Sequence, residues 1–585
     1  MSPAALPRRT SFLAALSSVL PYDPPVSATV ALRTAGATAD ARPVADTDTA
    51  AGPPPASNVP DPSHPLEDPA PSAKAVDAAY RPRAAVPTWI PARITSPRGA
   101  SVGVPTAQPT SSTSVGLARL VASRASWGAT PQLVADIRAS GATAWIDAQL
   151  APSSKVPDTE VDALVAKEWP RLKLQTWEVR DQYHPSSTGD LGVDVIAAYV
   201  ARAVWSKRQL LEVMVDFWTN HLVVTAPWGE AWDSVHRFHI DVVRKHALGR
   251  YADMLVASAK HPAMLNQLDN ASSTKRSPNE NYGRELLELH TVGVDGGYAE
   301  SDIRRSALVL TGLSTERESG EYLYRHIRHH RGAVSLLGWS DGNASAYGEP
   351  VATSYLVHLA RHPRTARRIA TKLAVRFVSD TPPSSLVDRL AKVYLDNDTK
   401  IAPVVRALLT SSEFAASAGK KTKRPLENII STARVLGVRP GPDTADWLGG
   451  LVWTAKRAGQ APMGWPAPNG YPDVAGAWAG AGAVLTAWNW HMSQCWEVGS
   501  DTPRVTYPPL RSLLPATLPA THGQLVDALA TRLVGAPLPA AKRDAVCAFV
   551  ERTAASPLKA SDPAASWRLP YLVALVLDTP EFATR

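Results

Sequence analysis

From residue 114 to the end of the chain, apolar residues recur at helical spacing and almost never alternate for long. Residues 116–152 read as three short helices separated by Gly and Pro. Residues 206–224 carry apolar side chains around most of a helix, which predicts a buried one. Helical spacing with polar caps recurs at 356–379, 384–397 and 400–414. The sequence therefore predicts an all-α fold, with one large multi-helical domain over 114–585 of which 504–585 is the C-terminal part.

The first 113 residues differ from the rest in composition. Residues 21–113 are rich in Pro, Ala, Ser, Thr and Asp, and large apolar side chains are sparse there. Such a segment buries too little surface to offset the entropy lost on ordering, so we predict a disordered Pro/Ala-rich linker. Within residues 1–20, Arg8-Arg9 precede a short apolar run, as in a poor secretory signal. An exported or cell-envelope location and a cytoplasmic one are both open.

Charge and cysteine content argue against several classes of protein. The net charge of +8 is scattered over 585 residues, whereas a nucleic-acid binder usually concentrates its basic residues. No stretch reaches the roughly 18 apolar residues of a transmembrane helix. P-loop, GxGxxG and GxSxG motifs are absent. Cys495 and Cys547 cannot make a disulfide framework, and free thiols are favoured over a single bridge.

The stretch SPNENYGRELLELHTVGVDGGY concentrates polar side chains ahead of a Gly-Gly turn. Ser277 and Pro278 suit a helix N-cap and first turn. If residues 281–291 are helical, one face carries Asn281, Arg284, Glu285, Glu288 and Thr291. His290 falls on the opposite side with two leucines, so the pattern differs from that of a zinc-protease helix.

Two interpretations of this face are open. Glu285 and Glu288 place two carboxylates together, as acid–base catalysis or a divalent metal ion requires. Asn281 and Arg284 would complete that catalytic site, and Asp295 in the following turn is a third candidate metal ligand. Alternatively, Arg284 pairs with Glu288 four residues later, and the face is a structural polar network.

A second polar cluster, FWTNHLVV, ends the predicted buried helix. His221 is a candidate to assist the two glutamates in catalysis. Trp218 and Asn220 are candidate substrate contacts. Taken alone, a histidine on an apolar helix face is more often a satisfied core residue, so a structural role for His221 is the favoured alternative.

Two further segments supply candidate substrate-binding residues. Asp269 and Asn270 come shortly before the first motif, and the loop GQAPMGWPAPNGYPDVAGAW holds Trp465, Tyr471 and Asp473. Aromatic, proline-rich loops often wall a cleft for sugars or other flat ligands. A loop packed without a ligand accounts for the same residues equally well.

Five motifs together carry a resemblance to a known family. They are FWTNHL, HPAMLNQLDN, PNENYGRELLELHTVGVDGGY, TKRPLENIISTARVLG and GWPAPNGYPD. The chain resembles, from about Arg119 to its end, the bacterial family of unknown function 1800 (DUF1800). The resemblance implies a helical, often exported protein and no settled activity. Where the family usually has Thr this chain has Ala299, so Asp302 lacks its capping-box partner.

These observations support two functional hypotheses. The first is a metal- or carboxylate-dependent, hydrolase-like enzyme of the cell envelope, which uses Asn281, Glu285 and Glu288 on a small-molecule or polymer ligand. The second is a non-enzymatic protein that binds an envelope partner, in which the same cluster is structural. An enzyme requires the two glutamates to line an open cleft with a second polar cluster within reach, whereas a binding or assembly protein would bury both in salt bridges with Arg284 or another arginine.

Overall fold

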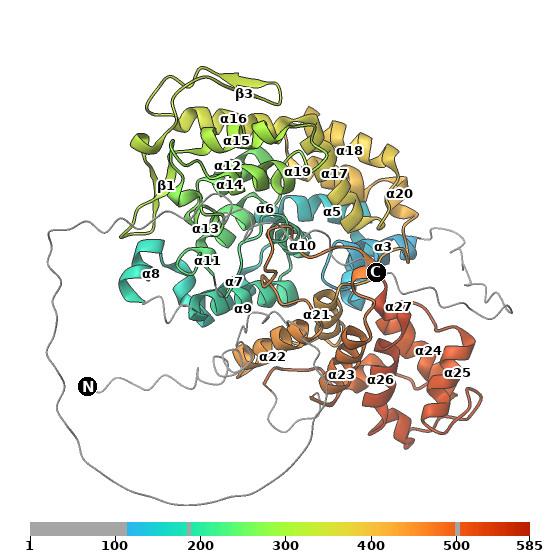
Figure 1. Ribbon diagram of the computed structural model, residues 1–585. Coiled ribbons are helices and arrows are strands. Elements are labelled where there is room, and N and C mark those ends of the chain that lie inside the picture. Colours follow the sequence, from blue (N-terminus) through green and yellow to red (C-terminus); the bar gives the residue numbers. More distant parts are fainter. Residues whose placement is uncertain (1–113, 184–188, 228, 498–503) are drawn as a thin grey trace, which may run out of the picture. The chain divides into compact units, whose positions relative to one another are not determined.

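The computed structural model describes residues 114–183, 189–227, 229–497 and 504–585 (Figure 1). Over these residues the regular elements are helices and two short hairpins, joined by loops, which confirms the predicted all-α fold. The signal-like segment predicted for residues 1–20 and the linker predicted for residues 21–113 lie outside the described residues.

The N-terminal helices follow the sequence pattern. They are α3 (Ser114–Arg124), α4 (Pro131–Ser140), α5 (Ala142–Leu150), α6 (Pro152–Lys155), α7 (Thr159–Glu168), η1 (Pro170–Lys173), α8 (Thr176–Gln182) and α9 (Gly189–Trp205). Helices α3, α4 and α5 are the three predicted short helices. Thr130 caps α4 by accepting the Leu133 N–H at 3.1 Å, and Gly141, with a φ of 83°, separates α4 from α5.

The next helices contain most of the candidate site residues. They are α10 (Gln209–Thr219), α11 (Val235–Arg237), η3 (Phe238–Arg244), α12 (Tyr251–Ala259), α13 (Pro262–Gln267), η4 (Asn270–Ser272), α14 (Glu280–Glu285), η5 (Leu286–His290) and α15 (Glu300–Leu310). Two of them, η3 and η5, are π-helices. Helix α10 is the buried helix that the sequence predicts, because Val213, Met214 and Val215 at its centre are fully buried.

Two hairpins follow α15. Strand β1 (Leu313–Thr315) pairs antiparallel with β2 (Tyr322–Tyr324), and β3 (Val334–Leu336) pairs antiparallel with β4 (Trp339–Asp341). Each strand has three residues, which is too few for an alternating pattern to stand out in the sequence. The sequence pattern therefore does not predict them.

The remaining helices complete the fold. They are η6 (His326–Arg328), α16 (Glu349–Arg361), α17 (Pro363–Phe377), α18 (Ser384–Asp396), α19 (Ile401–Leu409), α20 (Ser412–Ala415), α21 (Pro425–Val435), α22 (Thr444–Arg457), η7 (Ala475–Ala477), α23 (Ala481–Glu497), η8 (Leu510–Leu513), α24 (His522–Leu533), α25 (Ala540–Phe549), η9 (Pro563–Ala565), α26 (Leu569–Leu577) and α27 (Pro580–Ala583). Helix α17 packs along α18, and α14 packs along α15.

One hydrophobic core joins helices that are far apart in sequence. Val121 of α3, Val213 of α10, Leu373 of α17, Leu529 of α24 and Val573 of α26 are fully buried members of the same continuous cluster. Burial of each such side chain contributes about 1.5–3 kcal/mol to folding. The polar side chains on α10, α14 and α17 are therefore carried by elements that a common core holds in place.

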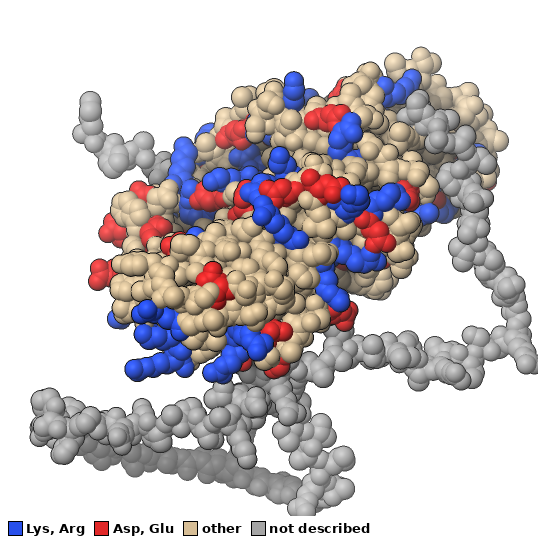
Figure 2. Space-filling model, turned by 90° about the horizontal axis from the view of Figure 1, so that it is seen from above, with Lys and Arg blue, Asp and Glu red and all other residues tan. Residues whose placement is uncertain are grey.

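The surface charge and the state of the two thiols agree with what the composition indicates. On the face shown in Figure 2, basic and acidic side chains are interspersed. None of the helices in the described part of the chain is long and apolar enough to cross a membrane. Cys495 and Cys547 are both buried and both free, the state that the sequence favours.

Candidate functional site

Helix α14 begins two residues later than the sequence predicts. The side chain of Asn279 accepts the Tyr282 N–H at 3.2 Å and donates to the Leu268 carbonyl at 2.6 Å. Ser277 instead closes a turn, in which its carbonyl accepts the Thr274 N–H at 3.0 Å. The predicted N-cap at Ser277 is therefore wrong, because Asn279 both caps α14 and ties it to the preceding segment.

The predicted polar face of this helix is present up to Glu288. Its members Asn281, Arg284, Glu285 and Glu288 are all partly exposed. His290 is buried on the other side, as predicted. Thr291 is a correction: it is buried, and its hydroxyl donates to the Leu286 carbonyl at 2.6 Å, five residues back. The π-helix η5 causes this difference, since its wider turn rotates the residues that follow away from the α-helical face.

Arg284 is paired, and Glu285 is not. The guanidinium of Arg284 lies 3.5 Å from Glu288 and also pairs with Glu300 at the start of α15. Within the described part of the chain, Glu285 makes neither a hydrogen bond nor an ion pair. Burial, together with the nearby Glu288, raises the pKa of Glu285 to about 7. Its carboxyl group can therefore both hold and release a proton near neutral pH.

Asp295 does not join the two glutamates. Its side chain is exposed in the turn after Gly293, and its backbone carbonyl accepts a hydrogen bond from Arg364. Among the residues that the structure describes, no group of three His, Cys, Asp or Glu side chains could hold a metal ion. The candidate metal ligands Glu285, Glu288 and Asp295 are thus not brought together as one set.

His221 lies in the interior beside Lys372. Its Nδ1 is 2.9 Å from the Lys372 ammonium, and its Nε2 is 3.0 Å from the Tyr251 hydroxyl. Tyr251 in turn donates to the His290 carbonyl at the end of η5. Because Tyr251 gives its hydroxyl proton to the His290 carbonyl, its oxygen accepts from Nε2 of His221, and Nδ1 then accepts from Lys372. No hydrogen bond joins His221 to Glu285 or Glu288, so it supports the end of η5 and does not meet the carboxylates directly.

Helix α17 connects these regions through a row of cations, one every fourth residue. Arg364 donates to the Asp295 carbonyl, Arg368 donates to the Leu289 carbonyl at 3.3 and 3.4 Å, and Lys372 contacts His221. Arg376, the last of the row, enters a buried group of charges. The spacing i, i+4, i+8, i+12 is visible in RTARRIATKLAVR, and it is the signal that could have pointed to this helix.

A buried charge cluster consists of Asp216, Arg376, Arg424, Glu427, Asp473 and Arg585. Arg376 pairs with Glu427, and Arg424 pairs with Asp216. Burial alone would raise the pKa of Glu427, but Arg376 and Arg585 hold it well below its usual range. These charges join α10, α17 and α21 across the core.

Asp473, a predicted substrate contact, belongs to that cluster instead. Its carboxylate lies 3.2 Å from the Lys421 ammonium, 3.7 Å from Arg376 and 3.6 Å from Arg585. Burial by itself would raise the pKa of Asp473, but the surrounding cations, Arg424 first, lower it. The carboxylate is therefore ionised, and its ion pairs hold the loop against α17.

Asn220 and Tyr471, two of the predicted substrate contacts, are hydrogen-bonded to each other. The Asn220 amide donates to the Tyr471 carbonyl at 2.8 Å and accepts the Tyr471 N–H at 2.6 Å. Trp465 stacks at a tilt against Tyr471, with ring centroids 4.6 Å apart. All three line a cavity of about 30 Å³. This volume suits about one water molecule, so the aromatic loop is packed and does not wall an open cleft here.

The other predicted substrate contacts are scattered. Trp218 is fully buried and donates its indole N–H to the Ala247 carbonyl at 2.9 Å. Asn270 is fully buried and donates to the Leu310 and Leu313 carbonyls at 3.3 and 3.2 Å. Asp269 is exposed, with a left-handed φ of 58°. Burial leaves Trp218 and Asn270 no surface for a substrate.

The capping box of α15 is half formed. The Ala299 N–H donates to the Asp302 carboxylate at 2.9 Å, although Ala299 has no hydroxyl to return the bond.

The comparisons with known proteins agree with the motifs. Residues 120–584 match the family described as "Protein of unknown function (DUF1800)". Neither the curated proteins nor the solved structures give a match. The matched span contains α14, η5, α17 and every member of the buried charge cluster except Arg585. The chain belongs to the DUF1800 family.

Proposed function

We propose that the chain is an acid–base enzyme, hydrolase-like in its chemistry, in which Glu285 transfers the proton. One observation carries this proposal. Asn281 and Glu285 lie one helical turn apart, both are partly exposed, and neither side chain is hydrogen-bonded to another described residue. Polar side chains at one face without partners of their own are available to a substrate.

The surroundings of Glu285 support a proton-transfer role. A general acid or base works best when its pKa lies near the working pH, and that of Glu285 is about 7. Arg284 would lower this pKa by pairing, but its guanidinium is directed to Glu288 and Glu300. Glu285 therefore keeps a proton that it can give to a leaving group, or accept one from water.

Asn281 and the row on α17 are assigned supporting roles. The amide of Asn281 would hydrogen-bond the substrate next to the Glu285 carboxyl group. Lys372, through His221 and Tyr251, and Arg368, through the Leu289 carbonyl, hold the end of η5. They are positioning residues, because none of them contacts Glu285.

A second candidate function is a binding or assembly protein of the envelope, in which these residues are structural. The pairing of Arg284 with Glu288 and Glu300 favours it, since these ion pairs join α14 to α15. Under this function the loss of Arg284 would weaken the fold, and the loss of Glu285 would change no turnover.

The two functions are separated by measuring hydrolysis of nitrophenyl esters, glycosides and phosphates by the full chain and by Glu285→Gln. The enzyme predicts turnover of at least one substrate, and loss of about 100-fold in kcat in Glu285→Gln with a melting temperature no lower than that of the wild type. Glu280→Gln, at the start of the same helix and paired with Arg304, is the matched control and should keep full activity. Equal turnover by Glu285→Gln, or no turnover together with a large melting-temperature loss in Arg284→Gln, would favour the second function.

A further inference from the structure

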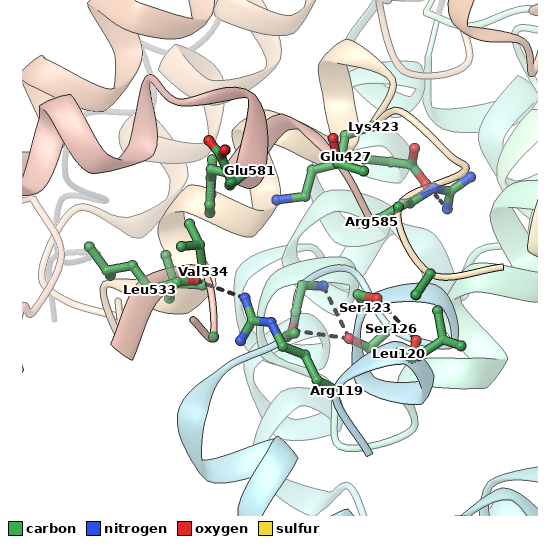
Figure 3. A pocket seen from close by; sticks show the side chains of 18 of the residues that line it. Arg119, Leu120, Ser123, Ser126, Lys423, Glu427, Leu533, Val534, Glu581 and Arg585 are labelled. Carbon is green, nitrogen blue, oxygen red and sulfur yellow. Dashed lines mark hydrogen bonds and ion pairs between the residues drawn. The ribbon is translucent and has the colours of Figure 1, made fainter. Parts of the chain in front are cut away.

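We propose that a pocket of about 630 Å³ beside α3 binds a small organic anion, a carboxylate or phosphate ester with an apolar part. The pocket is bounded by α3, the start of α21, the end of α24 and α27. Its volume falls in the range of sites for small ligands. Figure 3 shows Arg119 on one side of it and Lys423 on the other.

These two basic side chains lack carboxylate partners within the described part of the chain. Arg119 donates from its guanidinium to the Leu533 carbonyl at 3.1 Å. The Lys423 ammonium donates to the Ser431 hydroxyl at 3.0 Å and lies 3.5 Å from the centre of the Phe582 ring. A neutral oxygen and an aromatic face stabilise a cation less than an anion does.

The acidic residues of the pocket wall do not pair with Arg119 or Lys423, because they have other partners. Glu427 is 2.6 Å from Arg585 and also pairs with Arg376. Glu581 is 2.5 Å from Lys542. Glu427 and Glu581 are therefore not available to pair with the Arg119 guanidinium or with a protonated Lys423. Partly buried charge without a counter-ion is unfavourable, and a bound anion would supply the counter-ion.

The shape of the pocket also suits such a ligand. A Cβ atom at Gly535, which has a φ of 87°, would come within 2.2 Å of Nε of Arg119. The glycine thus lets the guanidinium lie across the end of α24. Trp127 and Phe582 give the pocket an apolar wall next to the cations, which matches an anion with an apolar part.

Burial also links binding to protons. It lowers the pKa of Lys423 well below its usual range, so the empty pocket favours the neutral amine. An anion beside it would favour the ammonium form, and binding would then take up a proton. None of Asn281, Glu285 and Glu288 lines this pocket, so the inference stands apart from the proposed enzyme.

The test is calorimetric titration of the full chain with hexyl phosphate and heptanoate, with heptanamide as the uncharged counterpart. We expect saturable binding of at least one anion, with proton uptake visible in two buffers of different ionisation enthalpy, and at least tenfold weaker binding of the amide. The anion that binds more tightly distinguishes a phosphate ester from a carboxylate as the ligand class.

Variants locate the binding. Arg119→Gln and Lys423→Met should each weaken anion binding at least tenfold, whereas Arg532→Gln, exposed on α24, and Glu285→Gln should not. A melting temperature for each variant separates loss of binding from loss of fold. Equal affinity for the amide and the anions, unchanged affinity in folded Arg119→Gln and Lys423→Met, or no binding of either anion would overturn the inference.

Discussion

The ammonium of Lys372 lies 2.9 Å from Nδ1 of His221, and no carboxylate among the described residues pairs with it. Burial, and after it Arg368, lowers the pKa of Lys372 to about 7. A cation held in this way depends on a neutral histidine, and burial lowers the pKa of His221 well below its usual range. The pair therefore joins α17 to the segment after α10 with one positive charge and not two.

This pair predicts a specific dependence of stability on pH. The amine of Lys372 titrates near 10.5 when unfolded and near 7 when folded, so the folded state disfavours its proton. The destabilisation caused by the buried ammonium is complete below about pH 7 and disappears as the pH rises toward 10.5. The free energy of unfolding of the wild type should therefore rise relative to Lys372→Met between pH 7 and 10, as measured by urea denaturation. Lys392→Met, an exposed control on α18, should run parallel to the wild type, and a parallel curve for Lys372→Met would contradict the account.

The raised pKa of Glu285 predicts the opposite dependence of stability on pH. Its pKa is raised from 4.5 to about 7 in the folded state, so it stabilises the fold fully below about pH 4.5 and loses that contribution as pH rises through 7. Glu285→Gln should be as stable as the wild type at pH 4.5 and more stable at pH 8, by about 1–2 kcal/mol after discount for solvent screening. Thermal unfolding at the two pH values measures this, with Glu280→Gln as control. A difference that is the same at both pH values would count against the raised pKa.

The contact between Asn220 and the aromatic loop can be tested at a glycine. A Cβ atom at Gly470 would lie 2.1 Å from the Asn220 carbonyl oxygen, and its φ is 75°. Gly470→Ala should therefore lower the free energy of unfolding by about 2–4 kcal/mol, because both strain and a displaced backbone contribute. Gly476→Ala in the same loop, where a Cβ atom meets nothing within 4 Å, should change it little. Equal effects in a urea titration would show that the loop is not held at this point.

The buried charge cluster predicts a large effect from one carboxylate. Glu427→Gln leaves Arg376 and Arg585 without their common partner, and breaking a buried pair in this way costs about 3–5 kcal/mol. Asp388→Asn, which breaks an exposed pair with Arg367, should cost less than about 1 kcal/mol. Chemical denaturation compares the two variants. Similar costs would mean that Glu427 is solvated in the folded protein.

The sequence predicts those parts of the site that depend only on the spacing of residues along a helix. Asn281, Arg284, Glu285 and Glu288 share a partly exposed face, because positions three, four and seven apart on a helix lie together whatever surrounds them. The three short helices at the start follow in the same way from Gly141 and Pro131. On this face the π-turn at η5 breaks the local rule, and it is why Thr291 is buried.

The part that could not be predicted depends on partners that are distant in sequence. His221 meets Lys372, 151 positions away, and Asp473 meets Arg376 and Arg585. Nothing local distinguishes a histidine or aspartate with such a partner from one that faces a ligand. The cation spacing on α17 is in the sequence, but its meaning appears only when each side chain is seen against a different neighbour.

The most direct test of the account is the protonation state of Glu285 near neutral pH. Infrared spectra of the protein labelled with ¹³C at glutamate carboxyls, recorded from pH 5 to 8.5 for the wild type and Glu285→Gln, isolate this group by difference. The account predicts a protonated carboxyl that titrates near pH 7 in the wild type and is missing in Glu285→Gln. Superimposable titrations in which every glutamate is ionised by about pH 5.5 would contradict it, and would remove the acid–base residue from the proposed enzyme.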